Sequence, residues 1–164
     1  MRKLTRPLLT VTLMAQLGCQ TAIDTHSTLP TSVTMHALDA AATVWLDDVS
    51  QISDSLRAVI THESEWNKMW TRAEGSRGES VSMPDVDFGR FYLLVVAAGT
   101  VDLGDWARVE AIGMHESILH ASVVSTRGCA PFISDGTPLH IVRVPHFDGQ
   151  VVFLESKAGP DKCT

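Results

Sequence analysis

Short apolar runs separated by turn-forming residues make up most of the pattern along this chain. The run from Phe91 to Ala98 is apolar throughout and is bounded by glycines, which predicts a strand buried on both faces. The stretches "TVWLDDV" (43–49) and "SLRAVIT" (55–61) predict two shorter strands before it. Two further stretches, "WARVEAIGM" (106–114) and "SILHASVVS" (117–125), follow one another closely and predict a β-hairpin.

The last strand signals lie near the C-terminus. The stretches "PLHIVRVP" (138–145) and "QVVFLES" (150–156) flank Phe147, Asp148 and Gly149. Because Asp-Gly is a strong turn signal, these residues predict two more strands joined by a tight connection.

One segment has the period of an α-helix. Its apolar residues recur at intervals of three and four, acidic residues occupy its first turn, Thr61 can cap its start, and Gly75 can end it. The apolar residues are Trp66, Met69, Trp70 and Ala73, and the acidic ones are Glu63 and Glu65. We therefore expect one helix near 62–74, packed on the β core by its tryptophans. The predicted fold is α+β and mainly β, a small antiparallel sandwich or roll of about six to eight strands.

The N-terminus has the pattern of a bacterial export signal. Arg2, Lys3 and Arg6 precede an apolar segment at 8–17, whose helical length of about 15 Å is roughly half of a bilayer core. Gly18 followed by Cys19 indicates lipoprotein processing, with lipid on the Cys19 sulfur and cleavage before that residue. An ordinary cleaved signal and an uncleaved anchor are the alternatives.

This interpretation sets the expected domain organisation. Residues 1–18 form the signal peptide, 19–40 a flexible tether rich in Thr and Ser, and 41–164 a single β-rich domain. The expected location is the bacterial cell envelope, periplasmic or at the cell surface, with the protein held to the membrane by its lipid.

Charge and cysteine content refine the picture. The formal net charge is −6, and removal of the three basic residues of the signal would lower it to −9. An acidic protein without a basic run is a poor match for a phosphate backbone, so no nucleic-acid partner is expected. Cys129 and Cys163 remain as a pair, which in an exported protein favours a disulfide. Two unrelated thiols are the alternative.

No catalytic motif was found in the sequence. The seven histidines have no helical i, i+4 spacing and no accompanying Cys-x-x-Cys, so we expect no metal site and no cofactor. The remaining catalytic possibility is a metal-dependent hydrolase that uses His120, His140 and His146 on neighbouring strands. The sequence also lacks the Gly-x-Ser-x-Gly motif of a serine nucleophile, and we expect no catalytic residues.

The order of motifs resembles one known family. A tryptophan helix ("ESEWNKMW"), an acidic lead-in to the central strand ("DVDFGRFYLLVVAAG"), a glycine loop and a late pair of strands ("TPLHIVRVPHFDGQVVFLE") follow one another from about residue 56 to 155. This arrangement resembles the PrcB C-terminal-like domain family, exported accessory and stabilising lipoproteins of protease complexes. Gly99 and Gly104 match the family's glycines in place, whereas Asp105 and Trp106 stand where the family has Gly and Tyr.

The resemblance implies a β-rich domain that binds another protein, such as an exported protease, without catalysis. The candidate partner-binding loop is then Gly99, Gly104, Asp105 and Trp106, since tryptophan is enriched in interface hot spots. A purely structural hairpin loop is the alternative interpretation of the same residues. A small-ligand or glycan-binding module with exposed tryptophans is the second functional hypothesis, and the metal-dependent hydrolase is the third.

Overall fold

The structure is a computed structural model that describes residues 33–75, 81–128 and 134–159. These residues form ten strands, one α-helix and one short 3-10 helix. In sequence order they are β1 (His36–Ala37), η1 (Ala40–Ala42), β2 (Thr43–Asp47), β3 (Leu56–Ile60), α1 (Glu63–Glu74), β4 (Phe91–Ala97), β5 (Val101–Asp102), β6 (Trp106–His115), β7 (Ile118–Thr126), β8 (Asp135–Gly136), β9 (Leu139–Pro145) and β10 (Gln150–Ala158).

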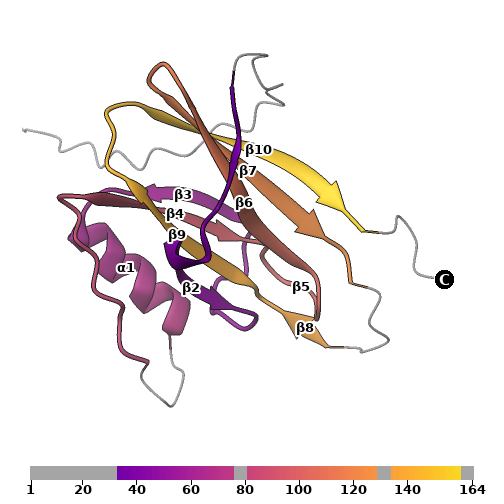
Figure 1. Cartoon of the computed structure of the whole chain (residues 1–164). Coiled ribbons are helices and arrows are strands. Elements are labelled where there is room, and N and C mark those ends of the chain that lie inside the picture. The colour runs from indigo at the N-terminus through magenta and orange to yellow at the C-terminus, as the bar shows by residue number, and fades with distance from the viewer. Residues whose placement is uncertain (1–32, 76–80, 129–133, 160–164) are drawn as a thin grey trace, which may run out of the picture.

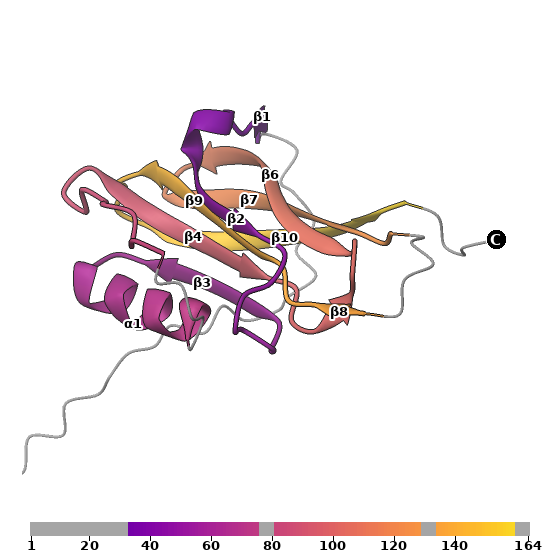
Figure 2. The same cartoon turned by 90° about the horizontal axis from the view of Figure 1, so that it is seen from below.

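Two four-stranded sheets pack face to face and form a β-sandwich (Figures 1 and 2). Sheet A has the strand order β1-β6-β7-β10, and sheet B has the order β2-β9-β4-β3. Alternate residues of both sheets point into the space between them and form an apolar core. This core includes Leu94, Val96, Val109, Val123 and Val142. The short strands β5 and β8 pair with each other at one end of the sandwich.

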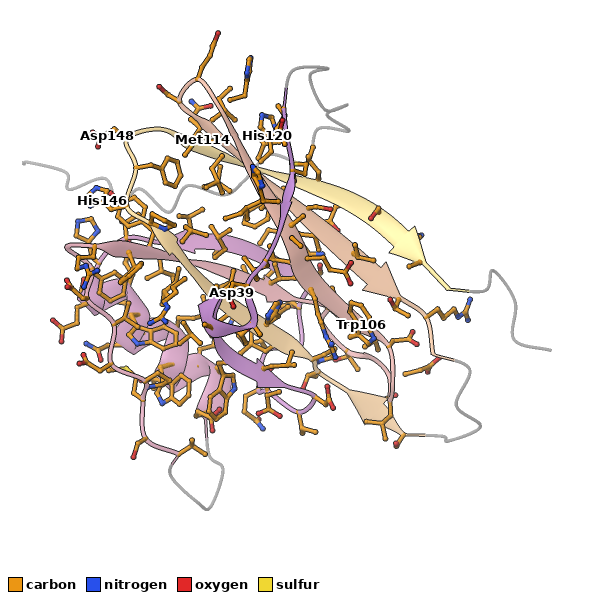
Figure 3. All side chains as sticks on the ribbon, in the orientation of Figure 1. Asp39, Trp106, Met114, His120, His146 and Asp148 are labelled. Carbon is orange, nitrogen blue, oxygen red and sulfur yellow. The ribbon has the colours of Figure 1, made fainter. Side chains whose placement is uncertain are left out.

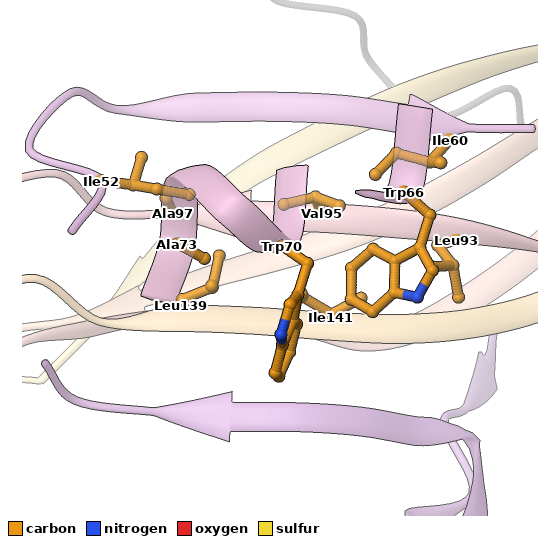
Figure 4. Close-up of a cluster of buried hydrophobic side chains, with 10 residues drawn as sticks. All are labelled: Ile52, Ile60, Trp66, Trp70, Ala73, Leu93, Val95, Ala97, Leu139 and Ile141. Carbon is orange, nitrogen blue, oxygen red and sulfur yellow. The ribbon is translucent and has the colours of Figure 1, made fainter. Parts of the chain in front are cut away.

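The helix covers the outer face of sheet B, as predicted (Figures 2 and 4). Trp66 and Trp70 are buried there, with ring centroids 5.3 Å apart, and Trp66 donates its indole N–H to the Pro84 carbonyl at 3.0 Å. Leu93 and Val95 alternate with the core residues of β4 and point toward the helix. The prediction that β4 is buried on both faces is therefore confirmed, because one face meets the helix and the other meets sheet A.

The ends of α1 differ in how well they were predicted. The N-cap residue is His62 and not Thr61, and the His62 side chain makes no capping hydrogen bond. Thr61 instead donates its backbone N–H to Glu65 Oε2 at 3.2 Å, so the glutamate side chain binds the backbone that enters the helix. At the other end Gly75 has φ 46° and donates its N–H to the Thr71 carbonyl at 2.9 Å, which confirms the predicted stop.

The strand pattern confirms a mainly β fold with one helix, but the predicted number of strands was too low. The described residues form ten strands, of which β1, β5 and β8 have only two residues each. Such short strands give no period-2 signal, because two residues cannot alternate recognisably. The predicted hairpin of β6 and β7 is confirmed as an antiparallel pair. The connection at 147–149 leads from β9 in sheet B to β10 in sheet A, where β10 pairs with β7 in parallel.

The folded part of the protein begins earlier than the predicted boundary at residue 41. β1 pairs with Ala111 and Ile112 of β6, so residues 36–40 of the predicted tether belong to the fold. Cys19, Cys129 and Cys163 lie outside the described residues, as do the signal segment and most of the tether. No helix in the described ranges is long and apolar enough to cross a bilayer.

Candidate functional site at the open side of the sandwich

The two long sides of the sandwich are built differently. On one side an ion pair joins the edge strands of the two sheets: Arg57 of β3 donates from Nε to Glu155 Oε1 of β10 at 2.6 Å and from Nη2 to Oε2 at 3.1 Å. Arg57 also donates from Nη1 to the Leu56 and Ala97 carbonyls. This side is therefore closed by a guanidinium whose donors are engaged by a carboxylate and two backbone oxygens.

The other side is formed by β2 of sheet B and β6 of sheet A, and it leaves a pocket of about 340 Å³. The backbone passes from β1 to β2 through η1 (Figure 2), and β1 pairs with only Ala111 and Ile112 of β6. The pocket walls come from Leu38, Asp39 and Ala40, from Thr43 and Leu46, from Arg108, Val109 and Glu110, and from His140.

His140 spans the gap between the sheets inside this pocket. Its Nδ1 accepts a hydrogen bond from the backbone N–H of Val109 at 3.1 Å. Without His140, this N–H would be unpaired at the free edge of β6. Because Nδ1 is the acceptor, the ring proton of neutral imidazole lies on Nε2, which is 3.3 Å from Thr43 Oγ1 and donates to it. Burial, and secondarily the nearby Arg108 charge, lower the pKa of His140 from 6.5 to about 4. His140 is therefore neutral near pH 7.

Arg108 and Trp106 form a stacked pair at the same edge. The two residues are i, i+2 on β6 and so share a face of the strand, and the guanidinium carbon lies 4.3 Å from the Trp106 ring centroid. The Nε of Arg108 is buried and meets no hydrogen-bond acceptor among the described residues. The pair therefore presents a fixed planar cation beside the pocket.

The predicted partner-binding loop is only partly a surface feature. Gly99 has φ 81°, and a Cβ there would lie 2.8 Å from the Ser55 backbone nitrogen, so this glycine is required for packing. Gly104 has φ 99°, and Asp105 Oδ1 accepts the Gly128 N–H at 2.6 Å. Trp106, labelled in Figure 3, lies at the start of β6 and is half-buried, and the Arg108 guanidinium lies over its ring. The loop is thus anchored by Gly99 and Asp105, and Trp106 contacts the pocket through Arg108, which lines it.

Three exposed apolar side chains surround this loop and pocket. Leu46, Val49 and Leu103 are 47%, 51% and 37% exposed. Leu46 lines the pocket with Arg108, whereas Val49 and Leu103 flank β8: Val49 bridges to Thr137, and Leu103 Cδ1 would lie 3.5 Å from a Cβ on Gly136. We call Leu46, Val49, Leu103, Trp106 and Arg108 together the candidate surface.

Sequence reasoning identified only Trp106 of this set. The i, i+2 spacing of Trp106 and Arg108 was available as a signal for the stacked pair, because residues two apart share a strand face. No signal marked Leu46, Val49 and Leu103 as exposed, because an apolar residue on a strand is ordinarily assigned to the core.

The three histidines of the hydrolase hypothesis do not come together. His140 lies between the sheets, and His146, six residues further along the strand direction, is about 20 Å away by strand rise. There its Nε2 lies 2.5 Å from the Tyr92 hydroxyl. His120 is opposite Gly113 on the outer face of sheet A and is buried, and burial together with the charge of His115 lowers its pKa. In the part of the protein that the structure describes, no group of three His, Cys, Asp or Glu side chains is arranged to hold a metal ion.

The glycan hypothesis predicted exposed tryptophans, and the structure does not show them. Trp66 and Trp70 are buried under α1, Trp45 packs edge-on against Trp70 with centroids 4.9 Å apart, and Trp106 is half-buried. All four tryptophans thus serve as packing groups, and Trp106 is the one that belongs to the candidate surface.

Comparison with known proteins adds no relative: no family model, curated protein or solved structure matches this sequence.

Proposed function

We propose that this protein is an exported, membrane-anchored bacterial lipoprotein whose β-rich domain binds another protein without catalysis. The N-terminal pattern ending at Cys19 supports the anchor. The resemblance to PrcB C-terminal-like domains between about residues 56 and 155 supports a role as accessory or stabilising subunit of an exported protease.

One observation carries the binding function. Exposed apolar side chains gather around the pocket and loop that contain the Arg108–Trp106 stack. Arginine and tryptophan are the residue types most enriched in interface hot spots, and apolar groups around them exclude water when a partner covers them. Grouped apolar side chains that are exposed on a protein surface mark interaction sites, so this set favours an interface.

The experiment places a photo-reactive phenylalanine analogue at Leu103 in the full-length protein, in the bacterium that produces it. We expect irradiation to link the protein to one defined protein of the envelope fraction. The matched control carries the same group at Met114, which is 48% exposed at the far end of β6. We expect no such product from Met114.

A second pair of variants tests the same surface by repulsion. Val49→Asp should abolish cross-linking from position 103, because an interface core does not tolerate an unpaired carboxylate. Met114→Asp should leave the cross-link intact. A product of equal yield from positions 103 and 114, or none from either, would contradict the proposal.

The anchor is tested separately. Mass spectrometry of the mature N-terminus should show a lipid-modified Cys19, and Cys19→Ala should move the protein out of the membrane fraction. An unmodified N-terminus at another position would support an ordinary cleaved signal.

The alternative of a small-ligand or glycan-binding module draws on the pocket of about 340 Å³ beside His140 and Arg108. It predicts a change in tryptophan fluorescence on addition of a ligand that is absent from Trp106→Ala. Stoichiometric zinc in the purified protein would instead favour the metal-dependent hydrolase.

A further inference from the structure

Among the arginines of the described residues, Arg108 is the one with a buried side-chain nitrogen that has no hydrogen-bond partner there. Arg57 binds Glu155 and two carbonyls, and Arg143 donates to the Ala41 carbonyl at 2.9 Å while stacking 5.3 Å from the Phe91 ring centroid. Arg108 stacks on Trp106, yet within the described residues its buried Nε has no acceptor, and it takes part in neither of the two ion pairs found there. A buried donor of this kind is unfavourable until an acceptor reaches it.

The charges around Arg108 restrict what that acceptor can be. His140 is neutral near pH 7, so Arg108 is the cation among the described residues that line the pocket. Asp39 and Glu110 also line it, and the Asp39 carboxylate is held by the Ala41 N–H at 2.9 Å. These two carboxylates repel a ligand with several negative charges, such as a run of phosphates, more strongly than a ligand with a single carboxylate, so the single charge is favoured at the guanidinium.

We propose, on the basis of the protein-binding function above, that Arg108 binds one carboxylate of the partner protein. The planar guanidinium is held in place by Trp106, which favours the paired hydrogen bonds that arginine forms with a carboxylate. Leu46 lines the same pocket, and Leu103 lies in the loop that leads into Trp106, so both exposed side chains can take apolar groups next to the carboxylate. The recognised element is therefore an acidic side chain, or the terminal carboxylate of the partner, with apolar neighbours.

The test follows the side-chain Nε–H resonance of Arg108 by NMR in the detergent-solubilised full-length protein. The probes are acetyl-Leu-Asp-Leu-amide, acetyl-Leu-Asn-Leu-amide, acetyl-Leu-Leu-Leu with a free C-terminal carboxylate, and inorganic phosphate. We expect the resonance to shift with at least one carboxylate peptide, at an apparent affinity at least tenfold above that of the Asn peptide and of phosphate. Saturation by the Asp peptide alone identifies an acidic side chain, and saturation by the free-carboxylate peptide alone identifies a C-terminus.

Variants separate a direct role of Arg108 from a structural one. Arg108→Gln should lower the affinity of the carboxylate peptide at least tenfold, and Arg108→Lys should recover part of it, because the charge is restored without the planar fork. Arg90→Gln is the matched control: Arg90 also stacks on an aromatic ring, 5.3 Å from the Phe91 centroid, but does not line this pocket. This control should bind as the wild type does.

Two results would overturn the inference. One is binding of the Asn peptide as tight as that of both carboxylate peptides, or no shift with either carboxylate peptide, and the other is unchanged binding by Arg108→Gln with its remaining spectrum intact. If the cross-link from position 103 still forms in the Arg108→Gln variant at wild-type yield, the protein-binding function stands and the role of Arg108 does not.

Discussion

Arg57 on β3 and Glu155 on β10 join the outer edge strands of the two sheets through two parallel hydrogen bonds. The two residues are 98 positions apart in the sequence and belong to different sheets, so the pair fixes how one sheet lies over the other along that side. Both side chains face the interior of the sandwich, where Arg57 shares a face of β3 with the core-packing residue Val59.

We expect Glu155→Gln to lower the free energy of unfolding by about 1–2 kcal/mol, because the half-buried Arg57 then lacks its charged acceptor. Urea denaturation monitored by tryptophan fluorescence measures the change. Asp54→Asn is the matched control: Asp54 pairs with Arg72 at 3.4 Å with 81% of its side chain exposed. That substitution should change stability by less than about 0.5 kcal/mol. Equal effects of the two substitutions would contradict the role assigned to Arg57 and Glu155.

The depressed pKa of His140 predicts that stability falls in mild acid. In the unfolded protein this imidazole titrates near 6.5, whereas in the folded protein it titrates at about 4, so the unfolded state binds the proton more readily. The stability that comes from keeping His140 neutral in the folded protein is fully present above pH 6.5 and is lost as the pH falls toward 4. The lowered pKa of His120 acts in the same direction.

For His140 alone the loss is on the order of 3 kcal/mol across this range. Urea denaturation of wild type and His140→Asn at pH 7.5 and pH 4.5 isolates the loss due to His140, because the titration of carboxylates is common to both proteins. The variant should be less stable than wild type at pH 7.5 and should lose less on acidification. An identical loss in the two proteins would show that His140 does not titrate as assigned.

Gly99→Ala should destabilise the fold and not only alter a binding loop. The residue has φ 81°, and its new Cβ would lie 2.8 Å from the Ser55 backbone nitrogen. Backbone strain and overpacking together should cost about 2–4 kcal/mol by chemical denaturation. Gly89→Ala is the control, since its Cβ would meet only the Asp87 side chain, at 3.1 Å. A stable Gly99→Ala protein with lost partner cross-linking would instead support a direct binding role.

Gly113→Val should release the segment before β1. A Cβ at this position would lie 2.7 Å from Met35 Sδ and from Val33 Cγ1, and 2.8 Å from the Thr34 carbonyl. We expect the amide of Leu38, which donates to the Glu110 carbonyl at 2.7 Å, to exchange with solvent at least tenfold faster. Amides of β4 should keep their wild-type rates, and a uniform acceleration across both would indicate global destabilisation.

The local elements of this fold could be predicted because each has a signal that lies within a short stretch of sequence. The apolar run of β4, the i, i+3, i+4 spacing of Trp66, Met69 and Trp70, and the two-residue turn between β6 and β7 all depend on neighbours within a few positions. The helix cap was predicted at the wrong residue, because Thr61 and His62 both precede the first turn and only packing selects between them. The strand count was too low because two-residue strands exist only through their pairing.

The candidate site was predictable only in part. Trp106 was singled out as an aromatic residue after a glycine loop, and it stacks with Arg108, which lines the pocket. The pocket beside it was not predictable, because it is formed by Arg108 and His140, from strands in different sheets, together with Leu46 of a third strand. Their proximity follows from how the sheets stack.

The sequence alone determined the fold class, the central strand and the position of the helix, because hydrophobic periodicity acts over a few residues at a time. Only the tertiary structure decided which edges of the sandwich are closed and which are left open. It placed Glu155 within reach of Arg57 on one side, and on the other left the Arg108 guanidinium stacked on Trp106 beside an open pocket. The reason is that the electrostatic and packing environment of a residue depends on residues from distant strands. Their separation along the sequence does not predict their distance in space.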